Sequence, residues 1–143
     1  MPLSPAEIRH NLNNFSGELV RYKTISPNAI FTPGVKYLAD ACKAYWLIDA
    51  IASHLGFNKK WLKAMKEDER LRHMSFWTLK TDLQKQTARL LAQADFDVKP
   101  AIIQYIEYTD FPLDEIKLYV GVTDFINDDE NKPLWVIYLP SEH

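Results

Sequence analysis

The sequence predicts an α+β fold, in which an antiparallel sheet of about five to six strands packs on a long central apolar helix, with one or two short helices beside it. Two observations support this prediction. An apolar run with helical periodicity occupies residues 34–55, and residues from Ser75 onward alternate with a period of two. Helices that precede a run of strands are typical of α+β proteins. The 143 residues are the length of one domain, so we expect a single domain over 1–143.

Two elements are predicted before the central helix. Residues 4–7 read Ser-Pro-Ala-Glu, a capping-box pattern with proline at the first helical position, which predicts a short helix over residues 5–13. Apolar and polar side chains alternate over residues 18–25, and this period predicts a strand. The Thr-Pro-Gly sequence at 32–34 then supplies a start signal for the central helix.

The central helix is predicted to run without a break over residues 34–55, with one broad apolar face. The residues on this face are Leu38, Ala41, Cys42, Tyr45, Ile48, Ala52 and Gly56. Asp49 projects into the same arc. An ionised carboxylate in a core needs paired donors, so Asp49 is predicted to be either a hydrogen-bonded structural aspartate or a functional group.

The polar side of this helix loses its charges after Lys43, where Trp46, Leu47 and Ala50 form an apolar strip. Such a strip is typical of a surface that another chain covers. It predicts binding to an unidentified protein or to a second copy in a homodimer. The alternative is that residues 58–73 of this chain fold back over the strip.

The second half of the chain contains most of the predicted strands. Asn58 is predicted to cap a surface helix, and the two-residue alternation begins at Ser75. Four further strands, connected as a meander, are predicted over residues 88–94, 102–109, 116–122 and 134–139. A helix over 83–93 stays open as the alternative to one of these strands, because that segment is rich in good helix formers.

Composition and motifs exclude several classes of function. Seventeen Lys and Arg against nineteen Asp and Glu give a net charge of -2, which argues against nucleic-acid binding. The sequence has no long apolar run and no cationic segment followed by an apolar one, so we expect a cytoplasmic protein with no membrane contact. Phosphate-loop, dinucleotide-binding and zinc motifs are missing, so no cofactor and no metal are predicted. The single cysteine, Cys42, is predicted to be a core side chain.

Two charged segments are better explained by exposure to solvent than by ligand binding. The acidic residues of 124–130 lack the glycine and the distal glutamate of a calcium loop, so a solvated turn between two strands is predicted. Residues 59–72 interleave basic side chains with Trp61, which suggests nucleic acid, but Glu67, Asp68 and Glu69 in the same segment favour a solvated helix.

Three sequence motifs resemble a known family. They are YLADACKAYWLID at 37–49, YTDFPL at 108–113 and YLPSEH at 138–143. In these motifs the chain resembles an uncharacterised family of small bacterial proteins, a domain of unknown function. The resemblance implies a bacterial origin and transfers no chemistry to any residue.

The leading hypothesis for function is non-catalytic binding of another macromolecule, in particular a protein, through the apolar helix surface or a sheet face. Its candidate binding residues are Trp46, Leu47 and Ala50. The alternative is a small enzyme with a general acid or base assisted by phenol groups. Its candidate residues are Asp49, Tyr45, Tyr108 and Asp110. Asp110 also has a purely local explanation, as an acceptor of backbone hydrogen bonds in a turn. Weak nucleic-acid binding is the third hypothesis.

Overall fold

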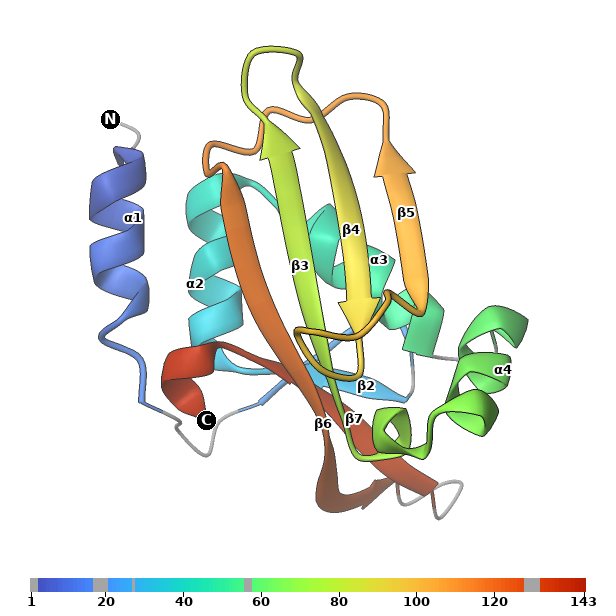
Figure 1. Cartoon of the computed structure of the whole chain (residues 1–143). Helices are drawn as coiled ribbons and strands as arrows, with labels where there is room; N and C mark the ends of the chain where they lie inside the picture. Colours follow the sequence, from blue (N-terminus) through green and yellow to red (C-terminus); the bar gives the residue numbers. More distant parts are fainter. Residues whose placement is uncertain (1–2, 17–20, 27, 56–57, 128–131) are drawn as a thin grey trace.

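The computed structural model describes residues 3–16, 21–26, 28–55, 58–127 and 132–143 (Figure 1). The first residues of the predicted strand at 18–25 and residues 128–130 of the predicted acidic turn at 124–130 lie outside the described residues. The prediction of a turn is wrong for residues 124–127, which continue a strand. Within the described part, no helix is long and apolar enough to cross a membrane.

A mixed sheet of seven strands dominates the described structure. The strands, in their order across the sheet, are β1 (Tyr22–Lys23), β2 (Ala29–Phe31), β7 (Lys132–Tyr138), β6 (Glu115–Asn127), β3 (Met74–Asp82), β4 (Thr87–Gln93) and β5 (Ile102–Ile106). Strands β2 and β7 are parallel, and every other neighbouring pair is antiparallel. The α+β prediction is therefore confirmed at the level of fold class.

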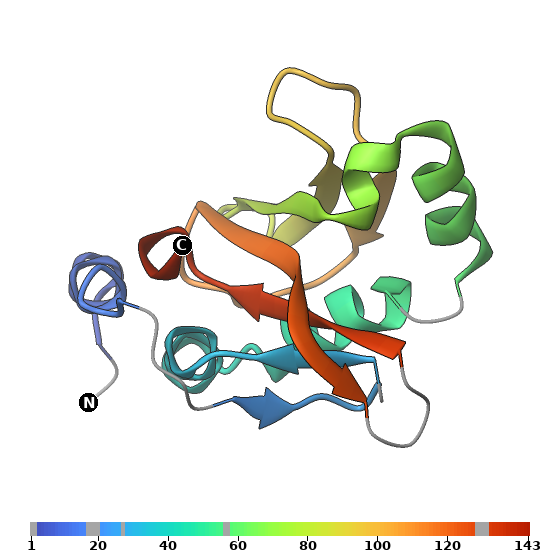
Figure 2. The same cartoon turned by 90° about the horizontal axis from the view of Figure 1, so that it is seen from below.

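The helices lie mainly on one side of this sheet. They are α1 (Pro5–Leu12), α2 (Pro33–Cys42), α3 (Tyr45–Leu55) and α4 (Lys59–Glu67), with short 3-10 turns η1 (Glu69–Arg72) and η2 (Pro140–Glu142). Helices α2 and α3 lie behind β3, β4 and β6, and α1 packs beside α2 (Figures 1 and 2). The capping box that starts α1 and the Asn58 cap of α4 are both present, as predicted.

The prediction of one long central helix is wrong. The chain leaves the helix at Lys43, whose φ of 53° is left-handed, and Ala44 separates α2 from α3. The backbone amide of Ala44 bonds to the carbonyl of Ala39, which closes the end of α2. The break turns α3 into a new direction, so positions in α2 and α3 no longer share one helical wheel.

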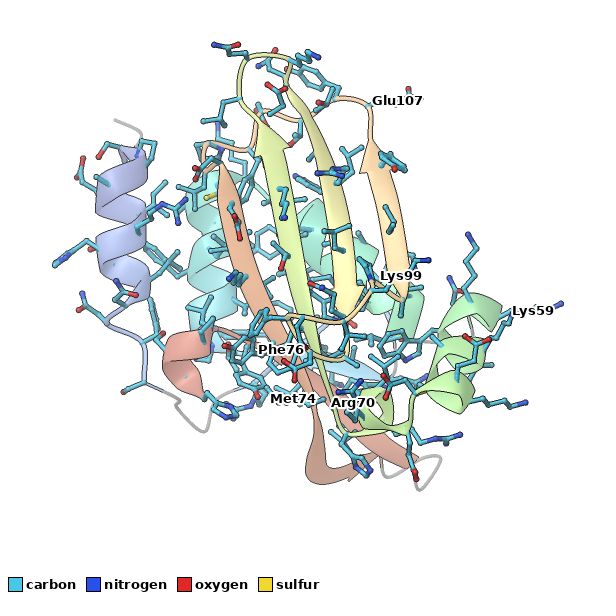
Figure 3. All side chains as sticks on the ribbon, in the orientation of Figure 1. Lys59, Arg70, Met74, Phe76, Lys99 and Glu107 are labelled. Carbon is cyan, nitrogen blue, oxygen red and sulfur yellow. The ribbon has the colours of Figure 1, made fainter. Side chains whose placement is uncertain are left out.

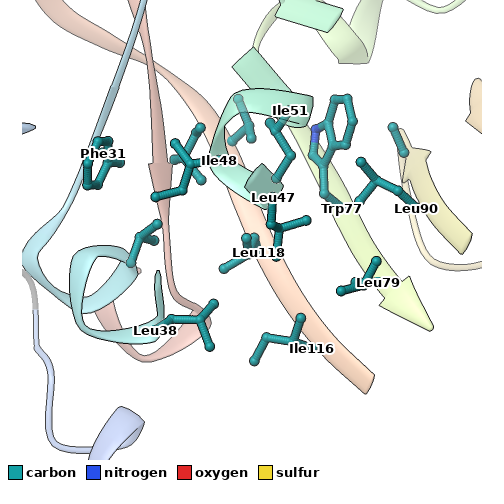
Figure 4. Close-up of a cluster of buried hydrophobic side chains, with 14 of the residues drawn as sticks. Phe31, Leu38, Leu47, Ile48, Ile51, Trp77, Leu79, Leu90, Ile116 and Leu118 are labelled. Atoms are coloured by element: carbon teal, nitrogen blue, oxygen red, sulfur yellow. The ribbon is translucent and has the colours of Figure 1, made fainter. Parts of the chain in front are cut away.

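The core lies between the two helices and the central strands (Figure 4). Leu38 of α2 and Leu47, Ile48 and Ile51 of α3 are buried, and they face side chains of the sheet. The facing side chains from the strands are Trp77, Leu79, Leu90, Ile116 and Leu118. Apolar residues that alternate along each strand supply this layer, which is the pattern that predicted the sheet.

The strand prediction at residues 88–94 is confirmed, and the helix alternative over 83–93 is wrong. Ala88, Leu90 and Ala92 all point into the core, which a two-residue period allows and a helix does not. The predicted meander is wrong after β5. Strand β6 returns to the far side of β3, and the short strand β2, which was not predicted, inserts beside β7.

The C-terminal motif, residues 138–143, contacts the start of α2. The Glu142 carboxylate accepts hydrogen bonds from Thr32 Oγ1 at 2.6 Å, from the Leu139 amide at 2.9 Å and from the Gly34 amide at 3.4 Å. A negative group at this position complements the positive end of the helix dipole. A Cβ on Gly34 would lie 2.6 Å from both Glu142 Oε1 and Leu139 Cδ1, so a larger residue at this position would displace the ends of these two side chains.

Candidate functional site

Strand β5 forms one edge of the sheet, because it pairs with β4 and with no second strand of the described chain. Its side chains alternate. Gln104 faces α3, whereas Ile103 and Tyr105 point to the helix-free face and are 49% and 71% exposed. Lys99 and Glu107 lie at the two ends of the strand (Figure 3). A charge-free edge strand with exposed apolar side chains is a surface that can pair with another chain.

A groove of about 550 Å³ runs beside this edge, between α3 and the segment that follows β5. We call it the edge groove. Its lining residues are Trp46, Ala50, Gln104, Tyr105, Ile106, Tyr108, Thr109 and Asp110. The groove therefore brings together two of the predicted binding residues, Trp46 and Ala50, with two of the predicted pocket residues, Tyr108 and Asp110.

Hydrogen bonds and ring contacts hold the walls of the edge groove in place. His54 Nε2 of α3 lies 2.7 Å from Gln104 Oε1 of β5, and the His54 ring packs on Trp77. Trp46 meets Phe111 edge-on, with ring centroids 6.4 Å apart. Phe111 is 2% exposed, so it anchors the indole to the core. These contacts fix the spacing between α3 and β5 that defines the groove.

The turn after β5 is stabilised by Thr109, whereas the prediction assigned that role to Asp110. The Thr109 amide donates to the carbonyl of Gln86, and the Phe111 amide donates to Thr109 Oγ1 at 3.1 Å. The side chain of Thr109 is buried and that of Asp110 is exposed. The carboxylate of Asp110 is consequently available at the rim of the edge groove, beside Tyr108, which is 70% exposed.

Leu47 does not belong to a surface strip. It is 1% exposed and packs in the core, together with Ile48 and Ile51 on the same face of α3. The prediction failed because it continued the wheel of α2 through Lys43. Within α3 alone, positions 47, 48, 51, 52 and 55 share the buried arc, and only Trp46 and Ala50 are left beside the edge groove.

Asp49 and Tyr45 lie on the solvent side of α3, which corrects the placement of Asp49 in the core. Asp49 is half-buried, between exposed Tyr45 and exposed Ser53 on the helical wheel. Neither Asp49 nor Tyr45 lines the edge groove that holds Tyr108 and Asp110. The four candidates for an enzyme site are therefore split between two places.

Tyr45 belongs to a surface network that spans the break between α2 and α3. Its hydroxyl donates to Asp40 at 2.6 Å, and Lys36 Nζ lies 2.8 Å from the same carboxylate. The hydrogen bond from Lys36, followed by that from Tyr45, holds the pKa of Asp40 below its usual value. In return, Asp40 raises the pKa of Tyr45. The network joins the first residue of α3 to the outer face of α2.

The residues that could hold a metal or react as a nucleophile are not gathered at the edge groove. Among the residues that the structure describes, no group of three or more histidine, cysteine or acidic side chains is arranged to bind a metal ion. Cys42 is 5% exposed, and burial raises the pKa of its thiol to about 11. The thiol is therefore a packed core group, in agreement with the sequence.

A larger hollow of about 780 Å³ lies at the tip of the β3–β4 hairpin and shares Tyr105 and Ile106 with the edge groove. Its remaining lining is dominated by charged and amide side chains of the hairpin. We place the candidate site at the edge groove, because the exposed aromatic side chains and the free strand edge occur together there.

Sequence reasoning missed the residues of β5 itself, namely Gln104, Tyr105 and Ile106. A signal for them exists in the sequence. Residues 102–106 read Ile-Ile-Gln-Tyr-Ile, a charge-free run with Lys99 before it and Glu107 after it. An edge position cannot be inferred from that run alone, because the strand order depends on pairings that are distant in sequence.

The fold and the site define a small α+β protein with a mixed sheet, an open strand edge and an adjoining groove. The model of a family of unknown function, DUF6876, matches residues 6–143. This match covers nearly the whole chain, and the protein therefore belongs to that family. No curated protein and no solved structure matches the chain.

Proposed function

We propose that this protein acts by binding another protein chain, without catalysis, along β5 and in the edge groove. The observation that carries the proposal is the free edge of β5 beside exposed aromatic side chains. An extended segment that adds to a sheet edge gains main-chain hydrogen bonds, and a neighbouring groove supplies selectivity for its side chains. Tyrosine and tryptophan are the residue types that protein interfaces favour.

The alternative of an enzyme draws less support from the geometry. A general acid or base and its assisting groups must lie within hydrogen-bond reach of one substrate. Tyr108 and Asp110 line the edge groove, whereas Asp49 and Tyr45 do not. We further propose the cytoplasm as the compartment, which agrees with a single buried cysteine that has no disulfide partner in the chain.

A photo-crosslinking amino acid placed at Tyr108 tests this proposal in the host cell. Tyr45 provides the matched control, because it is also an exposed tyrosine, at 43%, but lies outside the edge groove. We expect discrete protein adducts from position 108 and none of the same mass from position 45. Identical adducts from both positions, or no adduct from position 108, would contradict the proposal.

A further inference from the structure

We propose that the chain bound at the β5 edge is a second copy of this protein, and that the two copies pair β5 with β5, antiparallel, about a twofold axis at Gln104. The inference rests on the proposed function and names its partner. Such a dimer would join the two seven-stranded sheets into one continuous sheet. Three observations support it: the contrast between the two sheet edges, the self-complementary register, and the charges at the ends of β5.

The two edges of the sheet differ in how they are protected. Strand β1 has two residues, and one of them is Lys23, so its edge is short and charged. Strand β5 has five residues without a charge or a proline, and its register with β4 continues without a bulge from Ile102 to Ile106. Folded proteins normally blunt an edge with charges, prolines, bulges or short strands. The edge of β5 has none of these features.

The pattern of side chains on β5 fits pairing with itself. A twofold axis normal to the sheet keeps the helix-free face of one copy continuous with that of the other. Directly opposed residues then point to the same face, so the axis must pass midway between the two copies of one residue, and Gln104 is the centre of the strand. In this register Ile103 of each copy lies opposite Tyr105 of the other. Both side chains are exposed in the single chain, and an aromatic side chain opposite a β-branched one is a favourable cross-strand pair.

The charges at the two ends of β5 are opposite in sign. Lys99 precedes the strand, and Glu107 and Asp110 follow its end. All three side chains are exposed. Continued past the ends of β5, antiparallel pairing about Gln104 puts Lys99 of one copy opposite Thr109 of the other and diagonally across from Glu107, on the same face of the sheet. The same contact occurs twice, once at each end of the paired strands.

In the described part of the chain, Lys99, Glu107 and Asp110 have no ion pair. Complementary charges at an interface fix the orientation of the partners.

The mass of the protein in solution tests the inference. Sedimentation equilibrium of the wild-type chain is expected to give twice the monomer mass of 16.6 kDa. Ile103→Lys is expected to raise the dimer dissociation constant about tenfold or more, because it removes a cross-strand pair on each side of the axis. Ile25→Lys is the matched control, since Ile25 is 74% exposed and lies near the opposite edge of the sheet. It should leave the dimer unchanged.

A charge exchange provides a second test that does not disturb the strand itself. Lys99→Glu and Glu107→Lys should each weaken the dimer, and the double variant should restore it toward the wild-type dissociation constant. A monomeric wild type overturns the inference, as does a dimer that is insensitive to Ile103→Lys and to both charge reversals. If the wild type is a monomer but position 108 crosslinks to a different protein, the proposed function stands and only the second copy is excluded.

Discussion

Gly34 and Glu142 provide a sharp test of how the C-terminus closes the fold. In an isolated helix, alanine is favoured over glycine by up to about 1 kcal/mol. In this protein a Cβ at Gly34 would lie 2.6 Å from Glu142 Oε1, so the carboxylate must move. It would then lose its bonds to Thr32 Oγ1 and to the Leu139 amide. Hydrogen bonds to a charged group contribute roughly 1.5–3 kcal/mol each.

We therefore expect Gly34→Ala to destabilise the protein by about 2 kcal/mol net, which would lower Tm by roughly 4–8 °C for a chain of this length. Denaturant unfolding measures the change, and a double-mutant cycle isolates its cause. In the Glu142→Ala background, Gly34→Ala should reduce the free energy of unfolding by clearly less, because only the Leu139 side chain would still lie close to the added Cβ. If Gly34→Ala stabilised the wild-type protein, or had the same cost in both backgrounds, the assigned contact would be refuted.

Four further predictions follow from burial and from the shifted pKa values. Leu47→Ala should destabilise the fold by about 2–5 kcal/mol in denaturant unfolding, and a change near zero would contradict the burial of Leu47. Asp49→Ala should change the stability by less than about 0.5 kcal/mol; a larger loss would restore a buried role for this carboxylate. The Cys42 thiol, with a pKa of about 11, should react with a disulfide reagent at pH 8 far more slowly in the native protein than in the unfolded one, and equal rates would refute its burial. The pKa of Asp40, measured by NMR, should lie below 3.8, and Lys36→Met should raise it. The stability that the Lys36–Asp40 contact contributes is present above pH 3.8 and is lost as the pH falls through the lowered pKa of Asp40.

The sequence was informative wherever the structure depends on local patterns. The capping signals placed the starts of α1 and α4, and two-residue alternation placed the core face of β3 and β4. These features depend on residues that are close in the chain, so one sequence is enough to predict them.

The break at Lys43 could not be predicted, because no glycine, asparagine or proline marks it. Ala39 to Ala44 are all compatible with a helix, and Lys43 adopts a left-handed conformation that is uncommon for its residue type. Packing of α2 and α3 against the sheet overrides the local preference. Because the break resets the helical wheel, the sequence placed Asp49 in the core and Leu47 at the surface, and the structure reverses both placements.

The candidate site was only half predictable for a related reason. Local sequence identified four residues of the edge groove as candidates, but under two different hypotheses. Trp46 and Ala50 were candidates for protein binding, whereas Tyr108 and Asp110 were candidates for an enzyme site. Only the strand order, with β6 returning to β3 and leaving β5 at the edge, brings these residues to one groove. That order depends on contacts between distant segments, which a single sequence does not reveal.

The most direct test of the central claim, that β5 pairs with another chain, is amide hydrogen exchange measured residue by residue at increasing protein concentration. Pairing of two copies should slow exchange in Ile102–Ile106 as the concentration rises, because edge amides become hydrogen-bonded. Exchange in β1, at the opposite edge, should stay constant. Exchange in β5 that is the same at every concentration would contradict the pairing of two copies, and equal slowing at both edges would show that association is not specific to β5.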